Sequence, residues 1–137
     1  MEDRKEKDPV GEFLRKRGCP DHVVRGGLRG LVKGWEEVVR SVGEGYGLGL
    51  DDYLNDMDGR QLLEEALAVA PAPEKKALLA RIRKADADMR ALLKPAGRCL
   101  WGEETARQEG WTERKNWWYY SRPIEAGKEL LADLGEG

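Results

Sequence analysis

Residues 116–123 read Asn-Trp-Trp-Tyr-Tyr-Ser-Arg-Pro and hold four of the ten aromatic residues of the chain. Each such ring buries roughly 150–250 Å² when it packs, so the surface that this run joins has a large share of the packing energy. Four consecutive aromatic residues cannot share one face of a helix, and aromatic residues favour strands. In an extended segment Trp117 and Tyr119 point to one face, and Trp118 and Tyr120 to the other. We therefore expect one pair to cover the core and the second pair, Trp118 with Tyr120, to face outward.

The rest of the chain has the composition of a small helical protein with charged outer faces. Its 137 residues fit one domain, 40% of them are apolar and 36% are charged. Lys and Arg number 24 against 26 Asp and Glu, so no charge imbalance directs the chain to nucleic acid or a membrane. No apolar run approaches the roughly 18 residues of a membrane span, and the charged first residues do not resemble a signal peptide. We expect a cytoplasmic protein of small bacterial type, with no membrane partner, a flexible tail at residues 1–7 and a single helical domain at residues 8–137.

Start and stop signals predict the first two helices. Asp8 followed by Pro9 is typical of a helix start, and Gly18 with Pro20 ends that helix. The clearest helix follows Asp21, because apolar residues then recur at steps of three and four and form one stripe. This stripe consists of Val24, Leu28, Leu31, Trp35, Val38 and Val42. We expect Trp35, at its centre, to be buried.

Later helices follow by the same arguments. Residues 51–70 predict either one kinked helix or two helices that meet at Gly59, and residues 73–92 predict a further one. Short helices are expected at residues 103–109 and near the C-terminus before Gly135. The fold class that follows is mainly α: a compact bundle of five to six helices with a short extended aromatic segment near the C-terminus, which a small two-stranded pairing could hold.

Three glycines at intervals of four, Gly26, Gly30 and Gly34, lie on one side of the helix after Asp21. Each costs roughly 0.5–1 kcal/mol relative to alanine in a helix, so a compensating gain is expected. Bare glycine faces let another helix approach closely. We expect such a helix-packing contact at Gly30; the alternative is that residues 21–27 form a turn and the helix starts later.

Residues 43–50 alternate glycine with larger residues. One interpretation is an extended segment whose bare face receives the rings of residues 117–120 in a two-stranded pairing. The other is a flexible connector. A phosphate-binding loop is disfavoured, because the Lys-Ser/Thr pair and the preceding apolar strand are missing.

Two neighbouring segments carry opposite charge. Residues 51–65 hold six acidic residues against one Arg, a net charge of −5, and residues 74–94 hold seven basic against three acidic, a net charge of +4. The two segments either complement each other or present a bipolar surface to a partner. The acidic cluster, Asp51, Asp52, Asp56 and Asp58, is interpreted as helix caps and a solvated face, with an acidic docking surface as the alternative. A calcium loop is disfavoured because Leu54 stands where the first oxygen ligand is needed.

Residues suited to metal binding or nucleophilic catalysis are few. Cys19, His22 and Cys99 could supply three zinc ligands, but a structural zinc site usually has four in two pairs. We expect buried free thiols, no metal and no cofactor. The two serines, Ser41 and Ser121, stand in no recognisable nucleophile motif, so no catalytic residue is assigned and an enzyme with carboxylate chemistry is the least favoured class.

The function that these observations favour is non-catalytic protein–protein binding, for example by an antitoxin-like or immunity-like inhibitor. A homodimer is one form that the partner could take. The alternative is a nucleic-acid-binding module that uses residues 114–122, where basic residues flank rings that could stack on bases. Under either hypothesis the binding residues are Arg114, Trp118, Tyr120 and Arg122.

Overall fold

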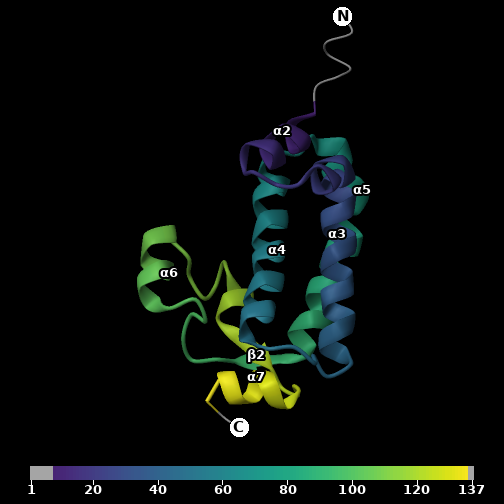
Figure 1. Ribbon diagram of the computed structural model, residues 1–137. Helices are drawn as coiled ribbons and strands as arrows, with labels where there is room; N and C mark the ends of the chain where they lie inside the picture. The colour runs from purple at the N-terminus through teal and green to yellow at the C-terminus, as the bar shows by residue number, and fades with distance from the viewer. Residues whose placement is uncertain (1–7, 136–137) are drawn as a thin grey trace, which may run out of the picture.

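The computed structural model describes residues 8–135 (Figure 1), so the tail expected at residues 1–7 lies outside the described part. It confirms a mainly α bundle with a small antiparallel pair of strands near the C-terminus. The elements, in chain order, are α2 (Pro9–Lys16), α3 (Asp21–Gly43), α4 (Leu50–Val69), α5 (Ala72–Ala91), β1 (Leu93–Pro95), α6 (Glu103–Glu109), the 3₁₀ turn η1 (Trp117–Tyr119), β2 (Ser121–Pro123) and α7 (Lys128–Asp133).

Helix α2 begins where the sequence predicts and lies across one end of the bundle (Figure 1). The Asp8 carboxylate accepts a hydrogen bond from the Gly11 amide at 3.1 Å, which satisfies one of the unpaired donors of the first turn. After the helix, Arg17 forms an ion pair with Glu65 of α4. This contact ties the N-terminal element to the bundle.

Three long helices form the body of the protein. Helices α3 and α4 run antiparallel side by side, and α5 packs on α3 from behind in the view of Figure 1. Helix α4 continues through Gly59, so the expected division there is resolved as one helix. Helix α3 contains a kink at Gly27, whose φ of 60° and ψ of −154° leave the helical region. That backbone conformation is essentially restricted to glycine.

One continuous core lies between these helices and the C-terminal segment. Trp35 is only 2% exposed, which confirms the prediction for the centre of the α3 stripe. The largest fully buried side chains include Tyr53 and Met57 of α4, Met89 of α5, and Trp118 and Tyr119 of η1. The aromatic run thus joins the helical core.

The glycine-rich connection between α3 and α4 is a turn, so the expectation of an extended segment that receives the aromatic rings is wrong. Gly45 has a φ of 104° and Tyr46 a φ of 27°, both incompatible with a strand. The Tyr46 ring is buried edge-on against Tyr53, with ring centroids 5.2 Å apart. Its hydroxyl donates a 2.6 Å hydrogen bond to Asp56.

The two strands pair elsewhere in the chain. β1 and β2 are antiparallel, with Leu93 opposite Pro123, Lys94 opposite Arg122 and Pro95 opposite Ser121. Helix α7 lies beside this pair at the end of the bundle away from α2 (Figure 1). No helix among residues 8–135 is both long and apolar enough to cross a membrane.

Candidate functional site

One side of α3 and the N-terminal half of α4 form a surface groove of about 630 Å³. We call it the α3–α4 groove. Gly26, Gly30 and Gly34 of α3, here called the glycine stripe, line it together with Gly59 of α4. A Cβ atom added at any of these four positions would meet nothing within 4 Å.

The expected close contact of another helix at the glycine stripe is therefore wrong for the folded chain itself. Helix α3 packs on the rest of the protein through Val24, Leu28, Val32, Trp35 and Val42. After the kink at Gly27, the core residues of α3 lie on roughly the opposite side of the helix from Gly30 and Gly34, because the helix has 3.6 residues per turn. The bare backbone faces the groove instead of a neighbouring helix.

Apolar side chains and a polar rim complete the α3–α4 groove. Val23, Leu31 and Val38 are half-buried in it, and Trp35 lies at its floor. The rim carries His22, Lys33 and Glu37 from α3 and Asn55 and Asp56 from α4. Such a surface, apolar below and polar at the edges, is suited to an amphipathic helix.

The pKa of Asp56, on the rim, is raised in the folded protein. Burial raises the pKa of its carboxyl, the hydrogen bond from Tyr46 lowers it, and the nearby charge of Asp52 raises it again, so the net change is upward. Burial, and then the same hydrogen bond, raise the pKa of Tyr46. Asp56 therefore anchors Tyr46, which lies in the turn between α3 and α4.

A buried guanidinium fixes the floor of the groove from below. Arg60 is 4% exposed and donates to both oxygens of Asp86 on α5, at 3.0 and 2.8 Å, and to Glu64 at 3.0 Å. The Trp35 indole donates to the same carboxylate at 2.9 Å, and the guanidinium lies 4.4 Å over the Trp118 ring. Burial lowers the pKa of Arg60, but its hydrogen bonds to Asp86 and Glu64 raise it above the usual value, so the group stays charged.

The charge pattern of the chain did not point to this ion pair. Each partner carries the minority charge of its segment: Arg60 in the acidic segment 51–65, and Asp86 in the basic segment 74–94. The available signal was spacing, since position 60 follows the buried Met57 by three residues and precedes the buried Leu63 by three. The basic segment also reaches α3 through Arg81, which pairs with Glu36 at 2.6 Å.

The aromatic run forms a 3₁₀ turn, so the expected alternation of its faces is wrong. Trp118 and Tyr119 are each 1% exposed, whereas Trp117 and Tyr120 are half-buried. A 3₁₀ turn has three residues per turn, so neighbouring side chains can enter the same core while their flanking residues stay near the surface. Asn116 holds the turn: its side-chain Nδ2 donates to Gln61 at 2.9 Å, and its side-chain Oδ1 accepts from the Thr112 backbone amide at 3.0 Å.

The four predicted binding residues consequently do not form one exposed surface. Trp118 and Arg122 are buried, Tyr120 is half-buried with its hydroxyl bonded to the Trp111 carbonyl, and only Arg114 is fully on the surface. The aromatic run does contact a different basic residue near the surface: Arg90 of α5 lies 4.5 Å over the Trp117 ring.

Several acidic side chains act as acceptors for aromatic donors. Asp58 accepts from the Tyr119 hydroxyl at 2.6 Å and from the Trp101 indole at 3.0 Å.

Within residues 8–135 no group of three or more His, Cys, Asp or Glu side chains is arranged to hold a metal ion. Cys19 and Cys99 are free thiols, the second fully buried, and burial raises the pKa of the Cys99 thiol.

Comparison of the chain with protein-family models, with curated proteins and with solved structures finds no match. The function must therefore be argued from the groove and its chemistry.

Proposed function

We propose that the protein acts without catalysis, by binding a helix of a protein partner in the α3–α4 groove. The observation that supports this proposal most is the glycine stripe, which leaves the helix backbone open to a neighbour that residues 8–135 do not supply. Helix α3 keeps these residues although each is a poor helix former. A partner helix that packs closely on bare backbone offsets that cost.

The other features of the groove support the same class of ligand. Half-buried Val23, Leu31 and Val38 offer apolar contacts along one edge of the stripe. Partner helices recognised in grooves present apolar residues at intervals of three and four, which fit such a row. Lys33 and Glu37 on the rim would set the direction of the bound helix.

This proposal moves the binding site away from residues 114–122 and keeps the class of function. An antitoxin-like or immunity-like inhibitor would be one form of it, with the inhibited protein contributing the bound helix. The free thiols Cys19 and Cys99 fit a reducing compartment such as the cytosol.

Site-specific photo-crosslinking in the native host tests the proposal. A photoreactive amino acid in place of Asn55, on the groove rim, should give protein adducts under ultraviolet light. The same amino acid in place of Ala87, exposed on α5 and outside the groove, is the matched control. Adding Gly30→Leu to the Asn55 variant should abolish its adducts, because the leucine occupies the groove.

Three results would contradict protein binding at this site: no protein adduct from position 55, equal adducts from position 87, or adducts that persist with Gly30→Leu. Adducts to nucleic acid from position 55 would instead support the alternative class of partner.

A further inference from the structure

A second pocket lies beside the pair of strands, and it shares no lining residue with the α3–α4 groove. Its volume is about 210 Å³, and its lining includes Arg90, Lys94, Glu113, Trp117 and Ser121. We propose that this pocket, here called the Arg90 pocket, binds a phosphate and the adjoining base of a single-stranded nucleic acid. The site is separate from the helix-binding groove, and neither proposal depends on the other.

Backbone hydrogen bonds fix the frame of the Arg90 pocket. In the pair of strands, Pro95 of β1 lies opposite Ser121 of β2. Just beyond the strands, the Ala96 amide donates to the Tyr120 carbonyl at 2.9 Å. Lys94 and Ser121 therefore project from paired strands instead of from a loose loop, which lowers the entropy lost when a ligand binds.

Arg90 is held in place before any ligand arrives. Its guanidinium carbon lies 4.5 Å from the centroid of the Trp117 ring, and that ring in turn meets Trp35 edge-on, with centroids 6.4 Å apart. Within residues 8–135 neither Arg90 nor Lys94 has a carboxylate partner, so their N–H groups remain available to an anion. An exposed guanidinium binds phosphate oxygens through its edge and stacks on a base through its free face.

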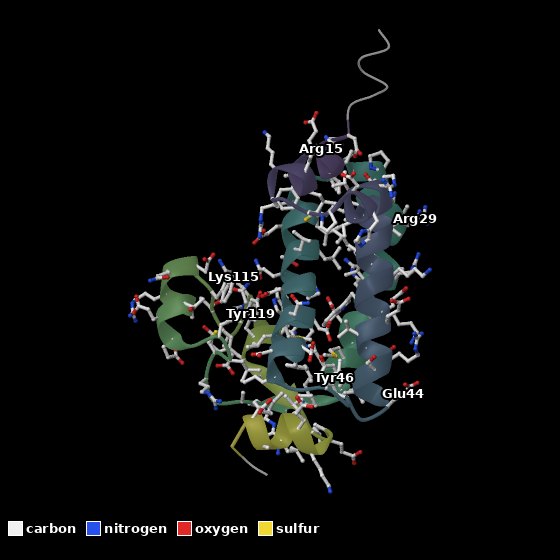
Figure 2. All side chains as sticks on the ribbon, in the orientation of Figure 1. Arg15, Arg29, Glu44, Tyr46, Lys115 and Tyr119 are labelled. Carbon is white, nitrogen blue, oxygen red and sulfur yellow. The ribbon has the colours of Figure 1, made fainter. Side chains whose placement is uncertain are left out.

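The charge around the pocket is strongly positive although the chain is slightly acidic. Residues 90–98 and 111–123, which the strand pairing joins, hold six basic residues against the single acidic Glu113, a net charge of +5. Since the whole chain has a net charge of −2, the other residues carry −7. Arg122 is buried, but the other five basic residues are exposed, among them Lys115, which lies between α6 and α4 in Figure 2. A polyanion is therefore directed to this part of the surface.

The size of the Arg90 pocket favours one unit of a longer chain over a free metabolite. Pockets that enclose a whole small ligand usually measure roughly 300–1,000 Å³, more than the 210 Å³ found here. Aromatic residues continue beyond the pocket, because Tyr120 and Trp111, joined by a hydrogen bond from the Tyr120 hydroxyl, are both half-buried. Rings among exposed cations are typical of surfaces that bind single strands. A strand also carries a phosphate at each nucleotide, which matches cations spread over two segments.

Fluorescence anisotropy with a labelled oligothymidine of about 12 nucleotides tests the inference. The purified chain should bind it at about 50 mM salt and roughly tenfold more weakly at about 200 mM salt, as about two to three phosphate contacts predict. Arg90→Gln should weaken binding roughly fivefold or more and reduce the salt dependence by about one contact. Arg90→Lys should keep the salt dependence and recover only part of the affinity, because lysine offers no flat face to a base.

Two further variants separate the Arg90 pocket from the general charge of the chain. Lys76→Gln removes an exposed cation near the other end of α5, about 21 Å from Arg90 along the helix, and should leave the affinity unchanged. Glu113→Gln removes the one carboxylate among the residues that line the pocket and should strengthen binding several-fold. Such a gain cannot result from misfolding. Far-ultraviolet circular dichroism checks that the weakened variants are folded.

The inference is wrong if the oligothymidine does not bind at low salt, or if Lys76→Gln weakens binding as much as Arg90→Gln. Binding that is lost with Gly30→Leu and kept with Arg90→Gln would place the strand in the α3–α4 groove instead. A labelled phosphoserine peptide that binds more tightly than the oligothymidine, and depends on Arg90, would identify another class of partner and also overturn the inference. The crosslinks from position 55 test the groove proposal separately.

Discussion

Arg60 is the residue on which most of the interior depends. Its guanidinium contacts Asp86 on α5 and Glu64 on α4, and it lies against the rings of Trp35 and Trp118. Three long helices and the aromatic turn therefore meet at one charged group. A buried ion pair of this kind is strongly destabilising when only one partner is removed, because the other charge is left without compensation.

We expect Arg60→Met to lower the free energy of unfolding by roughly 3 kcal/mol, the lower end of the range for a broken buried pair, because Asp86 keeps some contact with water. Asp86→Asn should also destabilise. The double variant should be less damaging than the sum of the two, by about 1 kcal/mol or more. Urea unfolding measures all three.

The matched control is Arg81→Met, which breaks the surface pair with Glu36. Its loss of stability should be far smaller, because water screens both charges. Additive effects of the two substitutions at Arg60 and Asp86 would mean that the observed hydrogen bonds contribute little.

The raised pKa of Asp56 gives a pH dependence with a definite sign. A carboxyl whose pKa is higher in the folded protein than the roughly 3.9 of an unfolded chain loses folded-state stability as it ionises. Asp56→Asn removes this titration and keeps an acceptor for Tyr46. The stability of Asp56→Asn relative to the wild type should therefore increase as the pH rises from about 3 to 7.

Urea unfolding at both pH values, with Asp51→Asn as an exposed control in the same helix, measures this difference. A relative stability of Asp56→Asn that stays constant or falls with rising pH would show that Asp56 ionises as easily in the folded state as in the unfolded one.

At the scale of the element, α3 contains glycines of two kinds. Gly30 has helical geometry with open space above it, whereas Gly27 has a φ of 60°. Gly30→Ala should raise the free energy of unfolding of the monomer by roughly 0.5–1 kcal/mol, through better helix propensity. Gly27→Ala should lower it by about 1 kcal/mol or more, because alanine is strained there.

Thermal and urea unfolding at low protein concentration compare the two variants. Equal effects would mean that α3 is not kinked at Gly27. A destabilising Gly30→Ala would mean that the stripe packs against something within the chain after all.

The elements with strong local signals were predictable, and those decided by tertiary contacts were not. Asp8 with Pro9 marks the start of α2, and Gly110 and Gly135 close α6 and α7 with positive φ values. These are short-range rules of capping and turn geometry. The pairing of β1 with β2 joins segments about 28 residues apart by three residues each, and no local pattern in so short a strand indicates its partner.

The candidate site was predicted in part. The sequence identified Gly26, Gly30 and Gly34 as unusual, but it assigned their open face to an internal helix. Which face of α3 meets α4 and α5 depends on where both helices pack, and this information is distributed over the whole chain. The prediction of an extended aromatic run was wrong for a related reason. Asn116 and its contacts with Gln61 and Thr112 hold the backbone in a 3₁₀ conformation that local propensity does not reveal.

At the scale of the whole molecule, we expect the described helices to unfold together. The core is continuous from Val10 in α2 to Leu130 in α7, and the Arg60 contacts bridge its parts. Tryptophan fluorescence and far-ultraviolet circular dichroism should therefore give coincident urea transitions. Separate midpoints would show that the chain comprises more than one cooperative unit and that residues 8–137 are not a single domain.

The bare backbone of the glycine stripe also affects how the amides of α3 exchange with solvent. Without side chains over Gly26, Gly30 and Gly34, water reaches the helical hydrogen bonds on that side directly, so brief local openings there exchange deuterium readily. Anything that settles on the stripe excludes this water and slows exchange at those amides first. The hydrogen–deuterium exchange rates of these α3 amides therefore report whether the groove is empty or filled.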